Sequence, residues 1–224
     1  MVMNQFIMTG KLSGGSTIAI DIHTRLFNRP GMRDLLNYDE ILSSARQMKI
    51  TDQTALAPST EHCLIHAALH LMAHHQNSRK LIWLHDIWLL TRSLKKEDTK
   101  RLLAYTSRKR IALILVCALE GCHRLFPLVD LKLLNKLKEQ AEHQENTEHP
   151  STIALTDSSL TDRLKTDWKA ISGVKTRLKW LKGHLFPSYS YISKKYNVDA
   201  FPLVWACYVW RIIHGSVKLL RSRS

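Results

Sequence analysis

Apolar residues recur every three or four positions through most of this 224-residue chain. Side chains at that spacing share one face of an α-helix, so the pattern predicts a mostly helical protein. The segments that carry it are 37–48, 59–75, 80–94, 97–107, 109–126, 129–142, 160–185 and 200–221. An aromatic stretch, FPSYSYISKKY at 186–196, separates the last two and is expected to form a turn.

One segment near the N-terminus departs from the helical pattern. In IAIDIHTRLF (18–27), the side chains alternate between two faces with the period of a β-strand: Ile18, Ile20 and Ile22 on one, and Ala19, Asp21 and His23 on the other. The turn sequence NRPG follows it. The expected fold class is therefore mostly α (α+β), with a short N-terminal hairpin or strand followed by a helical bundle. Because an isolated strand pair is only marginally stable, we expect it to pack on the first helices or to pair with another chain.

Composition shifts suggest four regions. Residues 1–30 contain the strand, residues 31–145 form a helical domain, and residues 160–224 form a basic C-terminal helical segment. The polar stretch QAEHQENTEHPS (140–151) includes Pro150, so residues 146–159 are expected to be a linker or loop.

The four cysteines lie in apolar helical patterns without the spacing of a disulfide framework or a zinc site, which predicts buried thiols in a reducing compartment. The N-terminus does not resemble a secretion signal. The longest apolar run, FPLVWACYVW (201–210), ends at Arg211, short of the roughly 20 residues that span a bilayer. We therefore expect a cytoplasmic protein that is not an integral membrane protein.

The formal charge of +14 is concentrated at the C-terminus. Residues 163–224 hold thirteen Lys and Arg against two Asp, a charge of +11. Such a surface attracts nucleotide phosphates, nucleic acid or anionic lipid, or is simply a solvated helix face. Trp168, Trp180 and Tyr189 are interleaved with the basic residues, which suits a nucleic-acid surface and a helical core equally well.

Four histidines, His62, His66, His70 and His74, follow one another at a spacing of four residues on one predicted helix. Residues four apart share a helix face, so neighbouring members of the row have the spacing of metal ligands. Zinc proteases use such a pair in HExxH, where the glutamate is the general base. Here the windows read HAALH and HLMAH, without that glutamate, so a zinc protease is excluded.

The dipeptide His85-Asp86 has two interpretations. In a metal phosphohydrolase of the HD type, the ligands would be His70 or His66, His85, Asp86 and Asp130. Asp86 lies within the apolar sequence LIWLHDIWLL, however, and a buried carboxylate must find a partner or take up a proton. A structural pair of Asp86 with His70 or His74 on the preceding helix meets that need without a metal.

The order of these features resembles the uncharacterised nucleotidyltransferase family of bacteria, a branch of the polymerase-beta-like superfamily. The matching stretches are IAIDIHTRLF, LAPSTEHCLIHAALHLMAHHQNSRKLIWLHDIWLL and LFPSYSYISKKYNVDAFPLVWACYVWRI. They correspond to the family's acidic strand, its "LHLxxH" helix, its "RLxWLxDIxxLL" helix and its C-terminal "LFPS" segment. The resemblance covers about residues 18–126 and 185–213.

The resemblance implies a magnesium site, of which one residue is present here. Polymerase-beta-like transferases bind the triphosphate at a glycine turn that opens a helix, and a later D-x-D strand holds two Mg ions with a third carboxylate. Four residues separate Ser16 from Asp21 and the strand reads D-I-H, so GGS (14–16) is expected to be a hairpin turn. The strand instead resembles the one with the third carboxylate. Asp21 would then complete the metal site or accept the proton of the acceptor hydroxyl, although Thr24 replaces the family's Trp.

This resemblance predicts a nucleotidyltransferase-family protein that uses Mg and an NTP and acts on an unidentified acceptor. The chain is expected to be the C-terminal part of such a protein, with residues 1–30 as a remnant of its sheet, and to be inactive alone. A partner chain or a preceding region would supply the missing half. The alternatives are a non-catalytic helical module for interaction or regulation, and the HD-type phosphohydrolase.

Overall fold

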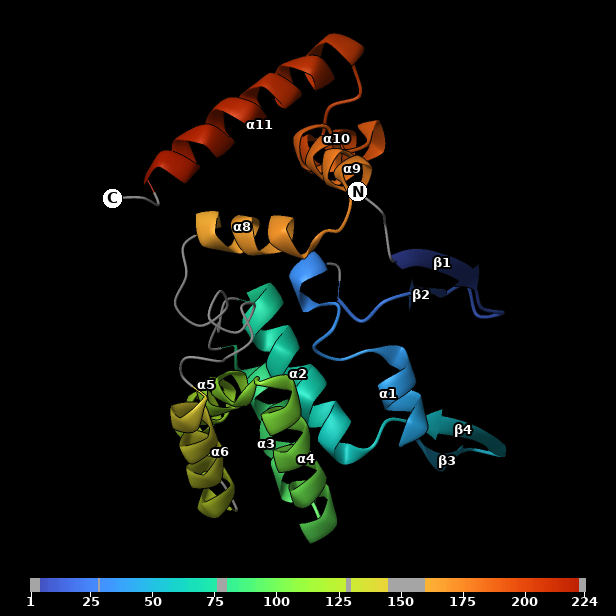
Figure 1. Cartoon of the computed structure of the whole chain (residues 1–224). Helices are drawn as coiled ribbons and strands as arrows, with labels where there is room; N and C mark the ends of the chain where they lie inside the picture. The colour runs from blue at the N-terminus through green and yellow to red at the C-terminus, as the bar shows by residue number, and fades with distance from the viewer. Residues whose placement is uncertain (1–4, 28, 76–79, 128–129, 145–159, 222–224) are drawn as a thin grey trace. The chain divides into compact units, whose positions relative to one another are not determined.

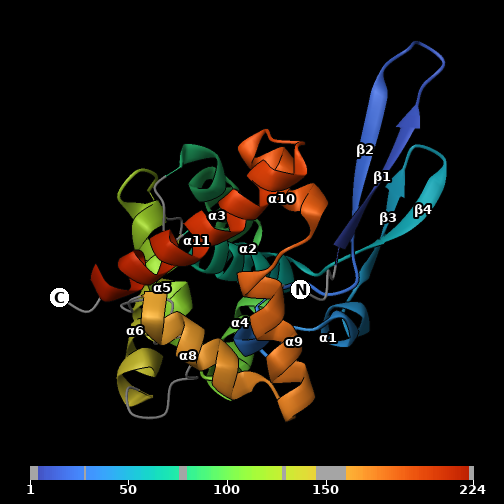
Figure 2. The same ribbon diagram turned by 90° about the horizontal axis from the view of Figure 1, so that it is seen from above.

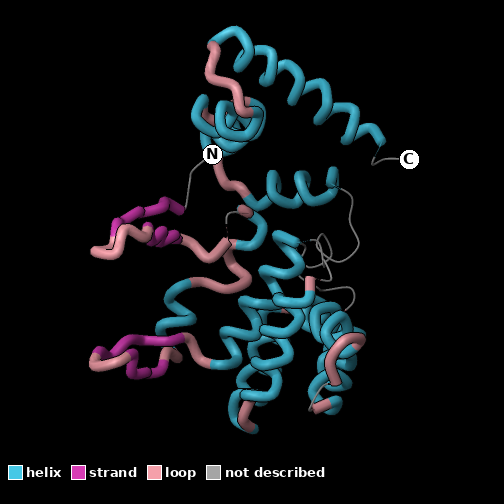
Figure 3. Tube along the Cα trace, turned by 180° about the vertical axis from the view of Figure 1, so that it is seen from behind, coloured by secondary structure: helices cyan, strands magenta, loops and turns pink. Residues whose placement is uncertain are grey.

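The computed structural model describes residues 5–27, 29–75, 80–127, 130–144 and 160–221 (Figure 1). The chain forms two compact units, Met1–Gly31 with Ser159–Ser224, and Met32–Ser158. The described residues also include two antiparallel strand pairs, drawn in magenta in Figure 3. This architecture confirms the predicted α+β class, in which helix predominates.

The unit Met32–Ser158 is a helical bundle built around one central helix. Helix α2 (Thr60–His75) packs against α3 (Leu81–Ser93), α4 (Lys96–Lys109) and α5 (Ala112–His123). Helix α5 also packs against α3 and against α6 (Leu131–His143), and the short α1 (Tyr38–Ser43) precedes the bundle (Figure 1). A 3-10 turn, η1 (Pro30–Met32), leads into this unit.

Apolar residues of α2 and α5 form the centre of the bundle. Leu64, Ile65 and Leu69 of α2 are fully buried, as are Ile114 and Leu115 of α5. The sequence of α5, ALILVCALEGCH, is apolar on nearly every side, which is the pattern of a helix enclosed by others. Helix α6 is instead amphipathic and buries only one face, through Leu133, Leu134 and Leu137.

The predicted helix 37–48 is wrong in its second half. Helix α1 ends at Ser43, and the chain continues into an antiparallel hairpin of β3 (Arg46–Ile50) and β4 (Gln53–Ala57). Thr51, at the turn, has a φ of 53°, in the left-handed region that ends regular structure. The hairpin projects from the helices (Figure 1), and every residue of β3 is exposed. Because no apolar face is buried, the strand has no periodic signal.

The other hairpin belongs to the unit that contains both chain ends. Strand β1 (Gln5–Lys11) pairs antiparallel with β2 (Thr17–His23), and Asp21 stands opposite Ile7. The connecting turn is closed by hydrogen bonds from Leu12 N to Ser16 O (2.8 Å) and from Gly15 N to Leu12 O (3.0 Å). Gly15 has a φ of 80°, which favours glycine. The GGS stretch is therefore a hairpin turn, as predicted, and Figure 2 shows the pair as a long arm.

Four helices complete that unit: α8 (Leu160–Ala170), α9 (Val174–Leu185), α10 (Tyr189–Tyr196) and α11 (Phe201–Arg221). The turn predicted at 186–196 is largely helical. Ser188 caps α10 by accepting a hydrogen bond from Tyr191 N, and Asn197 ends it in the left-handed conformation. Asp167 of α8 joins the two sequence-distant parts of the unit, because its carboxylate accepts from Arg29 Nε (3.0 Å) and Gly31 N (3.2 Å).

The four regions predicted from the sequence can be assigned to the two units. The predicted strand region and the predicted C-terminal segment are parts of one unit, and the predicted helical domain makes up most of the other. The predicted linker, 146–159, lies outside the described residues. Among the described residues, no helix has the length and apolar character needed to cross a bilayer.

The four cysteines are free thiols. Cys122 is buried, and burial raises the pKa of its thiol to about 11. Cys63, Cys117 and Cys207 are only partly buried, so the prediction of buried thiols is confirmed for Cys122 alone.

We expect Leu69→Ala to destabilise the bundle by about 2–5 kcal/mol, because it removes a fully buried side chain between packed helices and leaves a cavity. The measurement is the free energy of urea unfolding. Leu81→Ala, at a side chain that is 62% exposed, is the matched control and should change stability by less than about 0.5 kcal/mol. Equal losses in both variants would contradict this placement of the core.

Candidate functional site

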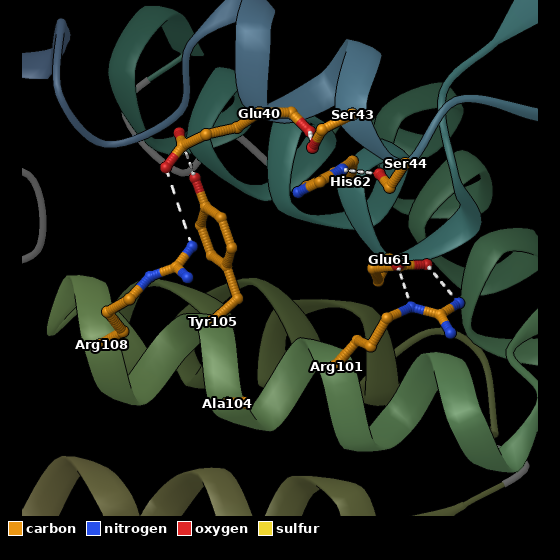
Figure 4. Close-up of a pocket in the computed structure, with 9 residues that line it drawn as sticks. All are labelled: Glu40, Ser43, Ser44, Glu61, His62, Arg101, Ala104, Tyr105 and Arg108. Carbon is orange, nitrogen blue, oxygen red and sulfur yellow. Dashed lines mark hydrogen bonds and ion pairs between the residues drawn. The ribbon is translucent and has the colours of Figure 1, made fainter.

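A group of polar side chains in the helical bundle surrounds a cavity of about 450 Å³ (Figure 4). Helix α1 and the residue that follows it form one wall, the first turn of α2 forms another, and α4 forms the third. The lining residues are Glu40, Ser43, Ser44, Glu61, His62, Arg101, Ala104, Tyr105 and Arg108.

Glu40 is held on one side of the cavity by several donors. Its carboxylate accepts from Tyr105 Oη (2.8 Å), from Lys109 Nζ (2.8 Å) and from the backbone N of Asn37 (3.1 Å). The last bond is half of a capping box that starts α1. Burial acts to raise the pKa of Glu40, but the bonds from Lys109, Tyr105 and Asn37 hold it below the ordinary value. Glu40 therefore stays ionised and orients the Tyr105 hydroxyl.

Glu61 and Arg101 form the pair on the other side. The Glu61 side chain is only 3% exposed, and it accepts from Arg101 Nε at 2.6 Å and from a second guanidinium nitrogen at 3.4 Å. Burial acts to raise the pKa of Glu61, but the bond from Arg101, its own backbone N–H and Ser59 lower it below its ordinary value. The pair ties α2 to α4. Breaking it would leave a buried charge without compensation.

His62 lies between the two carboxylates. Its Nδ1 is 2.8 Å from Ser44 Oγ and 3.2 Å from Ser59 Oγ, and its ring packs edge-on against Tyr105 with centroids 5.3 Å apart. His62 is 7% exposed. Burial lowers its pKa, and this outweighs the opposite influence of Glu61 and Glu40. The imidazole is therefore neutral at pH 7, and Figure 4 shows its second ring nitrogen pointing away from Ser44.

This arrangement can bind a polar ligand and exchange a proton with it. A neutral imidazole held by hydroxyls at Nδ1 presents either a donor or an acceptor at Nε2, depending on its tautomer. The Tyr105 hydroxyl keeps its proton, since burial and the bond to Glu40 raise its pKa. The side chains of Arg101 (53% exposed) and Arg108 (66% exposed) lie at the rim, where Arg101 pairs with Glu61 and Asp98 and Arg108 lies 3.7 Å from Glu40.

The predicted histidine row is divided between two places. His62 belongs to the first cavity, whereas His66 and His70 line a second one of about 270 Å³ with Ala67, Trp83 and Asp86. Asp86 is exposed there, so burial does not force its carboxylate to find a partner. The structural pair of Asp86 with His70 or His74 stays a prediction, because the side chain of His74 lies outside the described residues.

The residues of the HD-type hypothesis lie in three separate places. Asp86 lines the second cavity, whereas the His85 ring packs against Trp88 and Phe126, with centroids 5.6 and 5.7 Å away. Asp130 caps α6 by accepting from the backbone N of Lys132 and Leu133. In the described part of the chain, no three His, Cys, Asp or Glu side chains are arranged to hold a metal ion. The hypothesis therefore has no ligand set there.

Asp21 lies in β2, as predicted, but its side chain lies outside what the structure describes. Its role as a catalytic residue or magnesium ligand therefore stays a prediction.

The histidine row was predictable from the sequence, whereas the other residues of the first cavity were not predicted. Two local signals were present: Asn37 followed three residues later by Glu40 is a capping-box pattern, and Ser59 precedes α2. The contributions of Arg101 and Tyr105 had no such signal, because they come from a helix about 40 residues further along the chain.

Comparison with known proteins identifies the family. The protein-family model described as "Uncharacterised nucleotidyltransferase" matches residues 5–127, which include both hairpins and helices α1 to α5. The match covers more than half of the chain, so the protein belongs to this nucleotidyltransferase family. No match was found among curated proteins or among solved structures.

The pKa of His62 makes stability depend on pH. The pKa of His62 is lower in the folded protein than its ordinary value of 6.5. The contribution of neutral His62 to the stability of the fold is therefore complete above pH 6.5 and is lost as the pH falls through the pKa of the folded protein. We expect the midpoint temperature of thermal unfolding to be lower at pH 5.5 than at pH 8. This decrease should be smaller in His62→Asn.

The carboxylates Glu40 and Glu61 do not titrate in this window, since both pKa values lie below 4.5. His143→Gln, at an exposed histidine of α6, is the matched control and should retain the full pH dependence. If His62→Asn also retains the full pH dependence, the inference that His62 is buried in its neutral form is wrong.

Proposed function

We propose that this protein takes part in the transfer of a nucleotidyl group from an NTP to a polar acceptor. Its membership of the nucleotidyltransferase family, through a match that includes β2 with Asp21, is the observation that carries the proposal. Asp21 would be the third carboxylate of the catalytic centre, and the two carboxylates of the D-x-D strand would come from outside residues 1–224.

The chain's own residues do not fit a two-magnesium centre. Such a centre requires several carboxylates whose oxygens converge on the ions. Residues 1–224 contain no D-x-D sequence, and the described residues include no cluster of three metal-ligating side chains. We therefore propose that residues 1–224 are inactive alone.

The cavity around His62 is our candidate for the acceptor site. Its volume of about 450 Å³ lies within the range of small-molecule sites, and it belongs to the region that the family match covers. Neutral His62 suits hydrogen bonding to a hydroxyl-bearing ligand, and the Tyr105 oxygen, whose own proton is donated to Glu40 or to Leu35 O, could accept a further bond. Arg108, whose side chain is 66% exposed at the rim, would favour an acceptor that also carries negative charge, whereas Arg101 is already paired with Glu61 and Asp98.

The nucleotidyl-transfer proposal is tested with α-phosphate-labelled NTPs and Mg or Mn. Residues 1–224 alone should transfer no label to candidate acceptors. The protein assembled with the D-x-D segment, on the same chain or on a partner, should transfer it. Asp21→Asn should lower that rate by roughly 100-fold or more, the scale of losing a catalytic acid–base group.

The control is Asp52→Asn, in the exposed turn between β3 and β4, which should leave the rate unchanged. Robust metal-dependent transfer by residues 1–224 alone would refute the proposed inactivity. An assembled protein that is indifferent to Asp21→Asn would instead indicate a non-catalytic interaction module.

The acceptor cavity is tested in the same assembled protein with Ala104→Phe. Ala104 lines the cavity on α4 and is exposed, so a larger side chain fills the cavity without removing a polar group. We expect a raised KM for the acceptor and an unchanged KM for the NTP. Ala170→Phe, at an exposed residue of α8, is the control. An unchanged acceptor KM would place the acceptor elsewhere.

A further inference from the structure

A cavity of about 530 Å³ lies between α9, α10 and α11, in the unit that contains both chain ends. Two bonds hold α11 against the segment that joins α9 to α10. Tyr208 Oη donates to Pro187 O at 2.6 Å, and Arg211 donates to His184 O at 3.3 Å. The volume is within the range of small-molecule sites, and the cavity lies outside residues 5–127, which the family match covers.

Two cations meet at one hydroxyl of this cavity. Lys195 Nζ donates to Tyr191 Oη at 3.2 Å, and the guanidinium carbon of Arg211 lies 5.8 Å from the centre of the Tyr191 ring. The bond from Lys195 lowers the pKa of the Tyr191 hydroxyl, and Arg211 acts in the same direction, against the effect of burial. Because Tyr191 and Arg211 line the cavity, positive charge is concentrated at its wall.

The lining of the cavity includes no acidic residue among those that the structure describes. Asp199, which follows α10, accepts from Ser193 Oγ and is not part of the lining. Arg211 uses one donor on the His184 carbonyl, and a guanidinium has five N–H donors, so others are available to a ligand. An anion is therefore the complementary ligand.

Hydroxyl groups and aromatic rings complete the lining. Ser188 Oγ caps α10 by accepting from Tyr191 N, and it lies 3.3 Å from Ser190 Oγ. Only one of these two hydroxyls donates to the other, so the second keeps its proton for a ligand. Phe186 (46% exposed) and the ring of Tyr191 (42% exposed) add apolar surface. The cavity thus combines donors for an anion with an apolar wall.

We propose that this cavity binds a small molecule that carries a phosphate group on an aromatic or other apolar body. A phosphate monoester has a charge of about −2 and three terminal oxygens, which suits two cations and several hydroxyl donors better than the single charge of a carboxylate does. Arg211, Tyr191 and the serine hydroxyls bind the phosphate group, and Phe186 packs against the apolar body.

The ligand class is tested by isothermal titration calorimetry of the full chain with phenyl phosphate. The comparison ligands are phenol and inorganic phosphate, which are its two parts, and benzoate, which replaces the phosphate by a carboxylate. We expect phenyl phosphate to bind more tightly than each of the three by roughly tenfold or more. No binding of phenyl phosphate, or equally tight binding of any comparison ligand, would overturn the proposal.

The location is tested with Ser190→Asp, which adds a carboxylate to the lining. An acidic residue in the first turn of a helix is favourable, so α10 should stay folded while the affinity for phenyl phosphate falls by roughly tenfold or more. Thr176→Asp, exposed in the first turn of α9 and outside the lining, is the matched control and should bind as the wild type does.

Arg211→Gln removes the cation from the lining and should also weaken binding by roughly tenfold or more. Its control is Lys194→Gln, which removes a charge from an exposed residue of α10 outside the lining. Thermal unfolding establishes that each variant is folded. Undiminished binding by Ser190→Asp, or an equal loss in Thr176→Asp, would overturn the proposal. Binding does not require nucleotidyl transfer, so either proposal can fail without the other.

Discussion

The packing of α2 against three other helices is the constraint on which the helical bundle depends. Leu64, Ile65 and Leu69 are fully buried in the bundle that α2 forms with α3, α4 and α5. The histidines spaced four residues apart therefore emerge in the gaps between those helices. His62 enters a cavity beside α1 and α4, whereas His66 and His70 enter another beside α3. Histidines of one row in the sequence therefore line two different cavities.

Two carboxylates, the buried Glu61 and the partly buried Glu40, determine the chemistry of the first cavity. Each has a cation and further hydrogen-bond donors, so the pKa values of Glu40 and Glu61 are lowered despite burial. His62 has hydroxyl partners at Nδ1 instead of a paired carboxylate, and burial lowers its pKa. The site therefore combines fixed negative charge, a neutral imidazole and exposed guanidinium groups, which suits hydrogen bonding to a polar molecule. The same contacts join α1 and α2 to α4.

Several elements were predictable because their residues report their own burial. The apolar periods of α2, α3, α5 and α6 correspond to faces that the fold covers, whereas the alternation in β2 predicted the strand although Ile18 and Ile20 are exposed. The hairpin of β3 and β4 was not predictable, since β3 buries none of its residues and its apolar side chains overlap a helical pattern. Helix α10 was not predicted, because its aromatic residues beside Pro187 resemble a turn sequence. Ser188 and Asn197 are nevertheless recognisable as its caps once the helix is known.

The sequence by itself determined the family of this protein, its predominantly helical character and the position of Asp21 in an N-terminal strand. Those properties depend on residue order and on spacing within single elements. Only the tertiary structure decided which polar side chains share a cavity, since Glu40, His62 and Tyr105 are separated by 22 to 65 residues and meet through helix packing. It also separated His85 from Asp86, because adjacent residues on a helix point about 100° apart.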